Sequence, residues 1–384
     1  MKNLVNIGHL PPRLGGSAMV NEELVRGLSE AHDWNIRLIS HGLERFKGML
    51  TPTLLGTSIP IEWFVMDYFP AHEDAPAEYT QKKNEMILNS LHKVMSTFPA
   101  DAIMVGHECY AWSIPELKQL GLPIALVTHG TPTHGLGQGI YSNESRDELL
   151  RCMGESDIVI AVSQYLADIL NGFGIENVHV INNAIDIDMF SPRPPNQKLR
   201  AELDLAPEDF VVSHYSNMRP IKRVQDLVEA AKLVRNENFK YLIVGDGPCR
   251  EGVVDMVKAD GLQSKFKFLG KLPRKRIPEL MNLSDIVVST SEREGFGRSI
   301  REAQACGKVV IASRSGPALI QHGYDGLVYD VGNVDELAGY ILGVANNKFE
   351  AIGKNAVCTA KSYDLAAQVK EYSDVLNDLC LIHA

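Results

Sequence analysis

Short apolar runs recur along the whole chain, and each is followed by a longer segment with helical periodicity. The runs lie at residues 4–8, 36–40, 102–106, 124–130, 158–163, 178–182, 210–216, 240–246, 265–270, 285–291, 308–313 and 326–330. Continuous β-branched runs bounded by Gly and Asp are typical of parallel strands that are buried on both faces. Helical patterns lie between them, for example at 224–234 and 334–345. Repeated β-α units predict an α/β protein with parallel sheets and right-handed crossovers.

One segment interrupts this alternation. Residues 182–197 contain three prolines and three asparagines, which disfavour both helix and sheet. We therefore expect a linker here, and a chain of 384 residues is long enough for two domains. The expected domains are residues 1–181 and 182–365. An amphipathic pattern at 366–379 predicts a last helix, and we expect residues 366–384 to pack back on the first domain.

Composition excludes several classes of protein. Six cysteines are spread over both halves without a Cys-x-x-Cys pair, which favours reduced thiols over a disulfide framework or a zinc site. The N-terminus lacks the long apolar core of a signal peptide, and no stretch approaches eighteen uninterrupted apolar residues. We therefore expect a cytoplasmic protein without an integral membrane segment.

The net charge of −10 is concentrated in the first half of the chain. Residues 1–185 hold 12 Lys and Arg against 21 Asp and Glu. Such an acidic surface is a poor partner for nucleic acid or anionic lipid, although an acidic surface that is merely solvated has the same composition.

The segment 289–313 has the clearest chemical pattern. A strand ends in the loop Gly295-Phe296-Gly297, whose backbone N–H groups at a helix N-terminus suit a phosphate. Seven residues separate Glu294 in that loop from Glu302 in the expected helix. The alternative is an ordinary strand-turn-helix with two solvated glutamates. The apolar strand that follows Ala305-Cys306-Gly307 favours a buried helix with both carboxylates directed at a binding site.

Two further loops follow strands and carry suitable groups. Arg219 and Lys222 lie in a turn that leads into a helix, where two cations can neutralise a diphosphate leaving group. Basic residues at the start of a helix interact unfavourably with the helix dipole. A bound anion would explain why they occur there. Near the N-terminus, Gly15 and Gly16 allow the backbone to approach a ligand, although a plain turn fits equally well. The loop has neither the Gly-x-Gly-x-x-Gly nor the Walker pattern.

A histidine follows the apolar run at 124–130. His129 lies directly past the expected strand, in the position where ligands of doubly wound sheets bind. A single histidine is more often structural, but this position favours a site. His107 ends the run AIMVGH and is a second candidate.

These motifs together resemble glycosyltransferase family 4. The likeness rests on the Glu-x7-Glu motif with its Gly-Phe-Gly and Ala-Cys-Gly neighbours and on the Arg219–Lys222 turn, and it covers roughly residues 210–332. Residues 215–230 look especially like the N-acetylglucosaminyl-malate synthases of bacillithiol synthesis. Many family members have apolar residues between the glutamates, where this chain has Arg298 and Arg301.

The resemblance implies a GT-B fold, with two Rossmann-like doubly wound domains facing a central cleft. It implies a retaining glycosyltransferase whose first domain binds the acceptor and whose second binds a nucleotide sugar. The implied roles are donor-sugar hydroxyls for Glu294, ribose hydroxyls for Glu302 and donor phosphates for Arg219 and Lys222. Further implied contacts are the sugar 6-hydroxyl for His129, the diphosphate for Gly15 and Gly16, and the base for the backbone at Leu272.

The expected reaction transfers a sugar from a nucleotide diphosphate, either UDP-N-acetylglucosamine or UDP-glucose, to a small polar acceptor. A lipid-linked or polysaccharide acceptor, a GT-B sugar-nucleotide epimerase and an inactive sugar-nucleotide sensor remain alternatives. A nicotinamide dehydrogenase is disfavoured by the missing glycine fingerprint. No metal or other cofactor is expected, because Asp-x-Asp occurs only at Asp186–Asp188 in the linker. The oligomeric state stays open.

Overall fold

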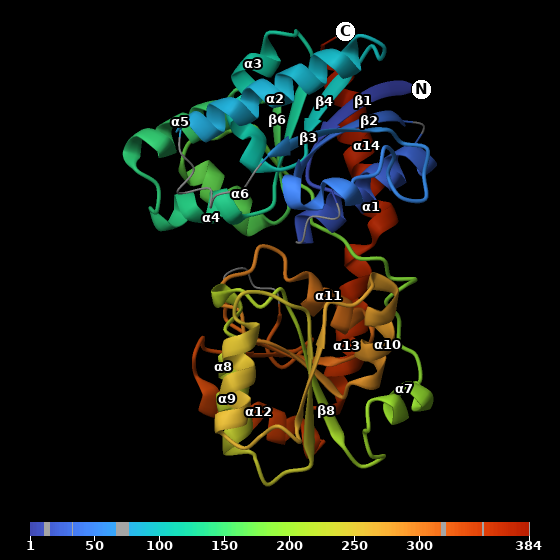
Figure 1. The fold of residues 1–384 in the computed structure, drawn as a ribbon, viewed down its shortest axis with the longest axis vertical. Helices are drawn as coiled ribbons and strands as arrows, with labels where there is room; N and C mark the ends of the chain where they lie inside the picture. Colours follow the sequence, from blue (N-terminus) through green and yellow to red (C-terminus); the bar gives the residue numbers. More distant parts are fainter. Residues whose placement is uncertain (11–15, 33, 67–76, 316–319, 348, 384) are drawn as a thin grey trace. The chain divides into compact units, whose positions relative to one another are not determined.

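The computed structural model describes residues 1–10, 16–32, 34–66, 77–315, 320–347 and 349–383. The chain divides into two compact units, and the division falls inside the segment 182–197. Met1–Asn183 together with Leu365–Ala384 form the first unit, and Ala184–Asp364 form the second. Both are α/β units built on parallel sheets (Figure 1).

The first unit contains a seven-stranded sheet in the described part of the chain, with the order β3-β2-β1-β4-β5-β6-β7. Its strands are β1 Lys2–Ile7, β2 Trp34–Leu43, β3 Ile61–Met66, β4 Ala102–Val105, β5 Ile124–Thr128, β6 Ile158–Ala161 and β7 Val178–Val180. The order reverses between β1 and β4, which pair in parallel. In open α/β sheets, ligands bind at the carboxyl ends of the strands where the order reverses.

Helices cover both faces of this sheet. On one face α1 (Gly16–Ala31), α6 (Gln164–Gly172) and α14 (Leu365–Ile382) share an apolar cluster with the strands. The other face is covered by α2 (Ala77–Met95), α3 (Ile114–Lys118) and α5 (Asn143–Gly154). The first unit also contains α4 (Thr131–Gln138). Burial on both faces explains why its central strands are continuous apolar runs.

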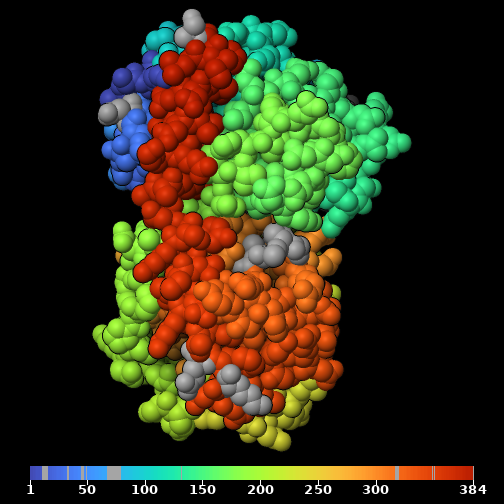
Figure 2. All heavy atoms as spheres, turned by 180° about the vertical axis from the view of Figure 1, so that it is seen from behind, coloured from blue at the N-terminus to red at the C-terminus, as the bar shows by residue number. Residues whose placement is uncertain are grey.

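The C-terminal helix α14 belongs to the first unit although it follows the second in sequence. Tyr372 and Leu376 are fully buried in the apolar cluster, and Trp34 Nε1 donates a hydrogen bond to Ser373 Oγ over 3.0 Å. Figure 2 shows this helix in red along the surface of the unit. Its removal would expose a face of the first core.

The edge strand β3 is absent from the runs expected from sequence. Its residues Ile61–Met66 read IEWFVM, in which the half-buried Glu62 and Trp63 interrupt the apolar pattern. β3 pairs with β2 and ends the sheet within the described residues. An edge strand has a more exposed surface than a central one, so its pattern is mixed.

The second unit contains a six-stranded sheet in the described residues, with the order β10-β9-β8-β11-β12-β13. Its strands are β8 Phe210–Tyr215, β9 Phe239–Val244, β10 Phe266–Gly270, β11 Ile286–Ser289, β12 Val309–Ser313 and β13 Leu327–Tyr329. The order reverses between β8 and β11, which pair in parallel. Ligand binding is therefore expected at the carboxyl ends of these two strands.

One face of the second sheet packs on α8 (Val224–Leu233), α9 (Arg250–Ala259) and α12 (Val334–Ala345). Further helices of this unit are α7 (Gln197–Glu202), α10 (Ile277–Leu283), α11 (Arg298–Ala305) and α13 (Glu350–Ala360). No helix in the described parts of the chain is long and apolar enough to cross a membrane.

Candidate active site

The loop after β8 carries the two expected phosphate ligands. Arg219 precedes the short 3-10 helix Pro220–Lys222 and is exposed. Within the described residues, the Arg219 guanidinium makes no hydrogen bond or ion pair, so it is available to a ligand. The next residue in the turn, Arg223, has a left-handed backbone with φ of 45° and forms an ion pair with Asp226 at 2.8 Å.

Two glycines after β9 pack closely against the backbone of this loop. A Cβ atom on Gly245 would lie 1.8 Å from the backbone oxygen of Ser216, and one on Gly247 would lie 1.8 Å from that of Asn217. Gly245 also has a φ of +117°, which L side chains rarely adopt. The motif VGDGP therefore has a packing role, because its backbone lies in close contact with the backbone of the loop that carries Arg219 and Lys222.

The structure brings Lys222 and Glu294 together from the ends of β8 and β11. Lys222 Nζ lies 2.7 Å from Glu294 Oε1, and Ser291 Oγ donates to the same oxygen at 2.7 Å. Both contacts use Oε1, and in the described part of the chain Oε2 of Glu294 makes no hydrogen bond. A cation and an open carboxylate oxygen thus lie side by side where the sheet order reverses.

Two hydrogen bonds to backbone carbonyls join the loop after β8 to the loop after β11. Thr290 Oγ1 donates to the carbonyl of Lys222 at 2.6 Å, and Glu292 N donates to the carbonyl of Ile221 at 2.8 Å. Glu294 N in turn donates to Ser315 O at 3.0 Å. Because the backbones are joined, the Lys222–Glu294 distance depends on both loops.

The loop Gly295-Phe296-Gly297 leads into α11. Gly297 has φ 66° and ψ 50° and immediately precedes the helix, as the sequence predicts. Phe296 is 7 % exposed and its ring meets Tyr363 edge-on at 5.5 Å. Phe296 is therefore part of the apolar packing that holds the loop, while the two glycines bring the backbone to the helix N-terminus.

Glu302 lies in α11 and is buried between two guanidinium groups. Arg274 Nη1 lies 2.7 Å and Arg298 Nε 2.8 Å from its Oε1, and the Glu302 side chain is 5 % exposed. Such pairing offsets the desolvation of a buried carboxylate. Among the described residues Oε2 of Glu302 makes no hydrogen bond. Arg274 was missed by sequence reasoning, since no motif links it to Glu302.

Leu272 follows β10 and is half-buried against the apolar cluster of Val244, Leu280 and neighbouring residues. The side chain is thus used for packing, and its backbone is the group that the family resemblance predicts to contact the base. The turn begins at Gly270, whose φ of +65° lies in the left-handed region that glycine adopts without steric cost.

In the first unit, His129 is held by its backbone and its ring. His129 N donates to Glu108 Oε2 at 2.8 Å, and His129 Nε2 lies 3.2 Å from Gly106 O. Burial lowers the pKa of His129 to about 4, so the ring is neutral at pH 7 and its Nε2–H donates to the Gly106 carbonyl. The ring also stacks on His107 with centroids 5.4 Å apart.

Glu108 is a buried acid that sequence reasoning missed. Its side chain is fully buried and accepts hydrogen bonds from the backbone N–H groups of His129 and Gly130, at 2.8 and 2.6 Å. Burial raises the pKa of Glu108 to about 7. The signal was its position two residues after Gly106 at the end of a strand, in the run AIMVGHE.

The remaining sequence candidates lie at the N-terminus of α1. Gly16 is the first residue of α1 and is exposed, with nothing within 4 Å of the place of a Cβ atom. Gly15 lies outside the described residues. A buried pair, Asn6 and Asn21, exchanges hydrogen bonds of 3.0 and 3.1 Å and ties α1 to β1.

The chain matches two family models. "Glycosyltransferase Family 4" matches residues 14–189, and "Glycosyl transferases group 1" matches residues 195–363. The N-acetyl-alpha-D-glucosaminyl L-malate synthase of Bacillus anthracis is 31 % identical over 338 residues, which cover 85 % of this chain and 84 % of that protein.

Solved structures share the fold. The Anabaena protein HepE in complex with UDP and glucose has a TM-score of 0.79 at 23 % identity, covering 98 % of this chain and 100 % of that one. Sucrose-phosphate synthase from Thermosynechococcus elongatus has a TM-score of 0.84 at 17 % identity, with 99 % of both chains covered. The chain therefore belongs to glycosyltransferase family 4 and is a GT-B enzyme that uses a nucleotide-sugar donor.

Proposed function

We propose that the enzyme transfers N-acetylglucosamine from UDP-N-acetylglucosamine to a small polar acceptor with retention of configuration, and that UDP-glucose is the next donor to consider. The choice of sugar is supported by the likeness of residues 215–230 to N-acetylglucosaminyl transferases. The name of the Bacillus anthracis relative contains the same sugar. The proposed site of action is the cytoplasm.

The pairing of Lys222 with Glu294 is the observation that carries this proposal. In the proposed complex Lys222 and Arg219 contact the donor diphosphate, while Oε2 of Glu294 accepts hydrogen bonds from sugar hydroxyls. The backbone N–H groups of Gly295, Phe296 and Gly297 lie next to Glu294 at the start of α11, where an anionic group is stabilised.

The nucleoside is assigned to the other end of α11. Oε2 of Glu302 accepts hydrogen bonds from the ribose hydroxyls, and the backbone at Leu272 contacts the base. Arg274 and Arg298 hold Oε1 of Glu302 and so orient the carboxylate. The family resemblance also assigns the diphosphate to Gly15 and Gly16, and the 6-hydroxyl of the sugar to His129.

The mechanism follows from how the two glutamates are held. A retaining hydrolase uses a carboxylate as nucleophile about 5 Å from a second one. Here Glu294 is paired with Lys222, and Glu302 is paired with Arg274 and Arg298. We therefore assign both to donor binding and the stabilisation of negative charge to Arg219 and Lys222. The departing phosphate oxygen takes the acceptor proton, so attack comes from the face that the leaving group vacates. This step needs no metal ion.

The acceptor is assigned to the first unit. The excess of Asp and Glu in residues 1–185 opposes nucleic acid and anionic bilayers, so a small hydroxylated molecule is proposed. L-Malate, which is in the name of the Bacillus anthracis relative, is the first acceptor to test.

The test is a turnover screen. The full chain is incubated with UDP-N-acetylglucosamine, UDP-glucose and GDP-mannose, each with L-malate, with other small hydroxy acids or without acceptor. UDP release and the mass of the product are followed by mass spectrometry. We expect acceptor-dependent release of UDP and a product heavier by one N-acetylhexosamine. Turnover restricted to GDP-mannose would contradict the donor, and UDP release without any acceptor would favour an epimerase.

A further inference from the structure

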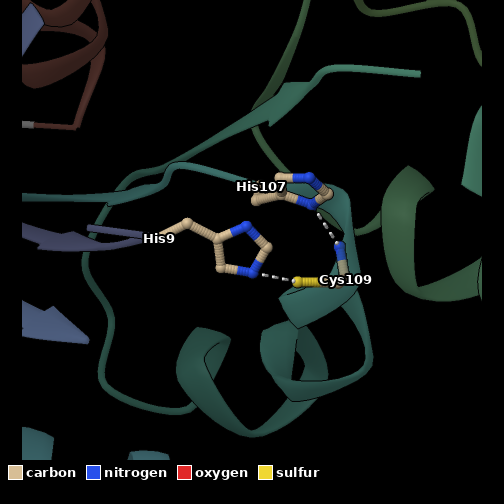
Figure 3. Close-up of side chains that lie close together, drawn as sticks. All are labelled: His9, His107 and Cys109. Atoms are coloured by element: carbon tan, nitrogen blue, oxygen red, sulfur yellow. Dashed lines mark hydrogen bonds between the residues drawn. The ribbon is translucent and has the colours of Figure 1, made fainter. Parts of the chain in front are cut away.

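Three potential metal ligands converge in the first unit, and we propose that they form a zinc site. His9, His107 and Cys109 offer ligand atoms that all lie within 4.8 Å of one another. Figure 3 shows both imidazole rings beside the thiol. The residues are 2 %, 5 % and 0 % exposed, so the group is screened from solvent. Histidine nitrogen and cysteine sulfur are the ligands that zinc prefers.

One pair of these side chains is already in contact, and the third lies beside it. His9 Nε2 lies 3.0 Å from Cys109 Sγ, a thiol–imidazole hydrogen bond that an ion would replace. His107 Nδ1 accepts a hydrogen bond from Cys109 N at 3.1 Å, so this nitrogen is unprotonated, and an ion would have to displace that N–H from its lone pair. On binding, Cys109 gives its thiol proton to solvent and the thiolate becomes a ligand.

The spacing suits a tetrahedral ion. Zinc bonds of about 2.0–2.1 Å to nitrogen and about 2.3 Å to sulfur place neighbouring ligand atoms about 3.3–3.6 Å apart. The sulfur and the nitrogen of His9 are now 3.0 Å apart and must separate by roughly half an ångström. The ligand atoms that are farthest apart, now within 4.8 Å of each other, must approach by up to roughly 1.3 Å.

Acidic groups lie at and beside the proposed position of the ion. Oε2 of the buried Glu108 lies 3.3 Å from His107 Nδ1, and the Glu108 carboxylate is held by the N–H groups of His129 and Gly130. The thiolate would neutralise one positive charge, and the buried carboxyl group of Glu108 lies beside the ion's proposed position. Ser17 Oγ lies 3.5 Å from His9 Nδ1, the nitrogen that faces away from the thiol.

The position in the fold indicates what such an ion would do. His9 follows β1 and His107 follows β4, so the site lies where the order of the first sheet reverses. Zinc takes four ligands, so a site of these three residues needs one more, such as a water molecule or a carboxylate or hydroxyl oxygen of a small molecule. This site goes beyond the proposed function, because the leaving diphosphate is assigned to Arg219 and Lys222 of the second unit.

The experiment uses the full chain, stripped of metal with a chelator and titrated with Co²⁺ as a spectroscopic substitute for zinc. We expect one saturable Co²⁺ per chain with a thiolate-to-cobalt charge-transfer band, and displacement of that band by one equivalent of Zn²⁺. Cys109→Ser should remove the band, and His9→Gln should weaken Co²⁺ binding at least tenfold. Cys152→Ser is the matched control, since Cys152 is a buried thiol of the same unit near Glu148.

Two results would overturn the proposal. One is the absence of saturable Co²⁺ binding to the unaltered chain, and the other is a charge-transfer band that survives in Cys109→Ser. Circular dichroism checks the folding of each variant. If Cys109→Ser does not fold, His9→Gln decides with the thiol intact, and unchanged Co²⁺ affinity in that variant contradicts the site. These readouts do not depend on turnover, so they stand apart from the sugar-transfer proposal.

Discussion

The ammonium group of Lys222 lies 2.7 Å from the carboxylate of Glu294, although 71 residues separate the two in sequence. They meet because β8 and β11 are neighbours in the second sheet, and the segments that follow these two strands leave the sheet at the same edge. The cation expected to contact phosphate and the carboxylate expected to contact sugar therefore form one unit. Replacing either residue by a neutral one therefore leaves the other without the opposite charge beside it.

Replacing Lys222 by Ala is expected to lower turnover by a factor of about 10²–10³, by analogy with the loss of one oxyanion donor. The reason is that the departing diphosphate loses a cation. Glu294→Asp keeps the charge and should lower turnover much less. Lys258→Ala, at an exposed ion pair on α9, is the control and should leave turnover unchanged. Initial rates of UDP release measure the effect, and a loss below tenfold for Lys222→Ala contradicts the assigned role.

Uridine diphosphate should raise the melting temperature, because it binds the native enzyme and not the unfolded chain. At about a hundredfold excess over the dissociation constant the gain is roughly 2.7 kcal/mol. Glu302→Ala should abolish most of this gain, whereas the exposed Glu251→Ala on α9 should keep it. Thermal unfolding with UDP, GDP and ADP provides the measurement. Equal melting temperatures with all three nucleotides and without any would exclude a uridine site.

The product is expected to keep the anomeric configuration of the donor. No carboxylate nucleophile is assigned, and the departing phosphate oxygen acts as base on the side that it leaves. Anomeric proton couplings in the product of an α-linked donor show the outcome directly. A β-linked product means inversion and would falsify the proposed mechanism.

Acid should destabilise the fold through His214. The residue is 1 % exposed, and its Nδ1 lies 2.9 Å from the carbonyl of Val288. Burial lowers its pKa from 6.5 to about 4, with a further lowering by Lys222 and a raising effect of Glu294. The unfolded chain therefore binds more protons between these values, so stability falls as pH drops from about 6.5 to about 4.

The shift in the pKa of His214 corresponds to about 3 kcal/mol of unfolding free energy. His214→Asn lacks the titrating ring but keeps an N–H donor for Val288. Its unfolding free energy should depend less on pH over this range than that of the unaltered chain. Urea unfolding at several pH values tests this, and equal pH dependence in the two proteins contradicts the prediction.

Two glycines of the second unit should respond to alanine in opposite directions. Gly245→Ala places a Cβ atom 1.8 Å from Ser216 O at a φ of +117°, and it should cost at least about 2 kcal/mol. Gly252 is exposed in α9 with nothing within 4 Å of the Cβ position, so Gly252→Ala should stabilise by about 0.5–1 kcal/mol. Denaturant unfolding distinguishes them. Equal effects of the two changes would argue against close packing under the 216–219 loop.

Local patterns in the sequence were enough for most of the architecture. Buried parallel strands need continuous apolar runs, so β8 and β11 are visible as the runs at 210–216 and 285–291. Gly297 at the start of α11 follows from the same local reasoning, because only nearby residues decide where a helix begins. The edge strand β3 escaped because its exposed side permits Glu62 and Trp63.

Tertiary structure decided which groups meet. Arg274 reaches Glu302, Glu108 lies beneath the backbone of His129, and His9 approaches Cys109 across 100 residues. No local spacing encodes these contacts, since they depend on the order of strands in each sheet. β1 pairs with β4 and β8 with β11, so side chains far apart in sequence leave neighbouring strands at one edge. The sequence by itself therefore determined most of the elements and the family motifs. Only the pairing of strands decided the composition of each candidate site, because hydrogen bonding between strands places distant residues at the same edge of a sheet.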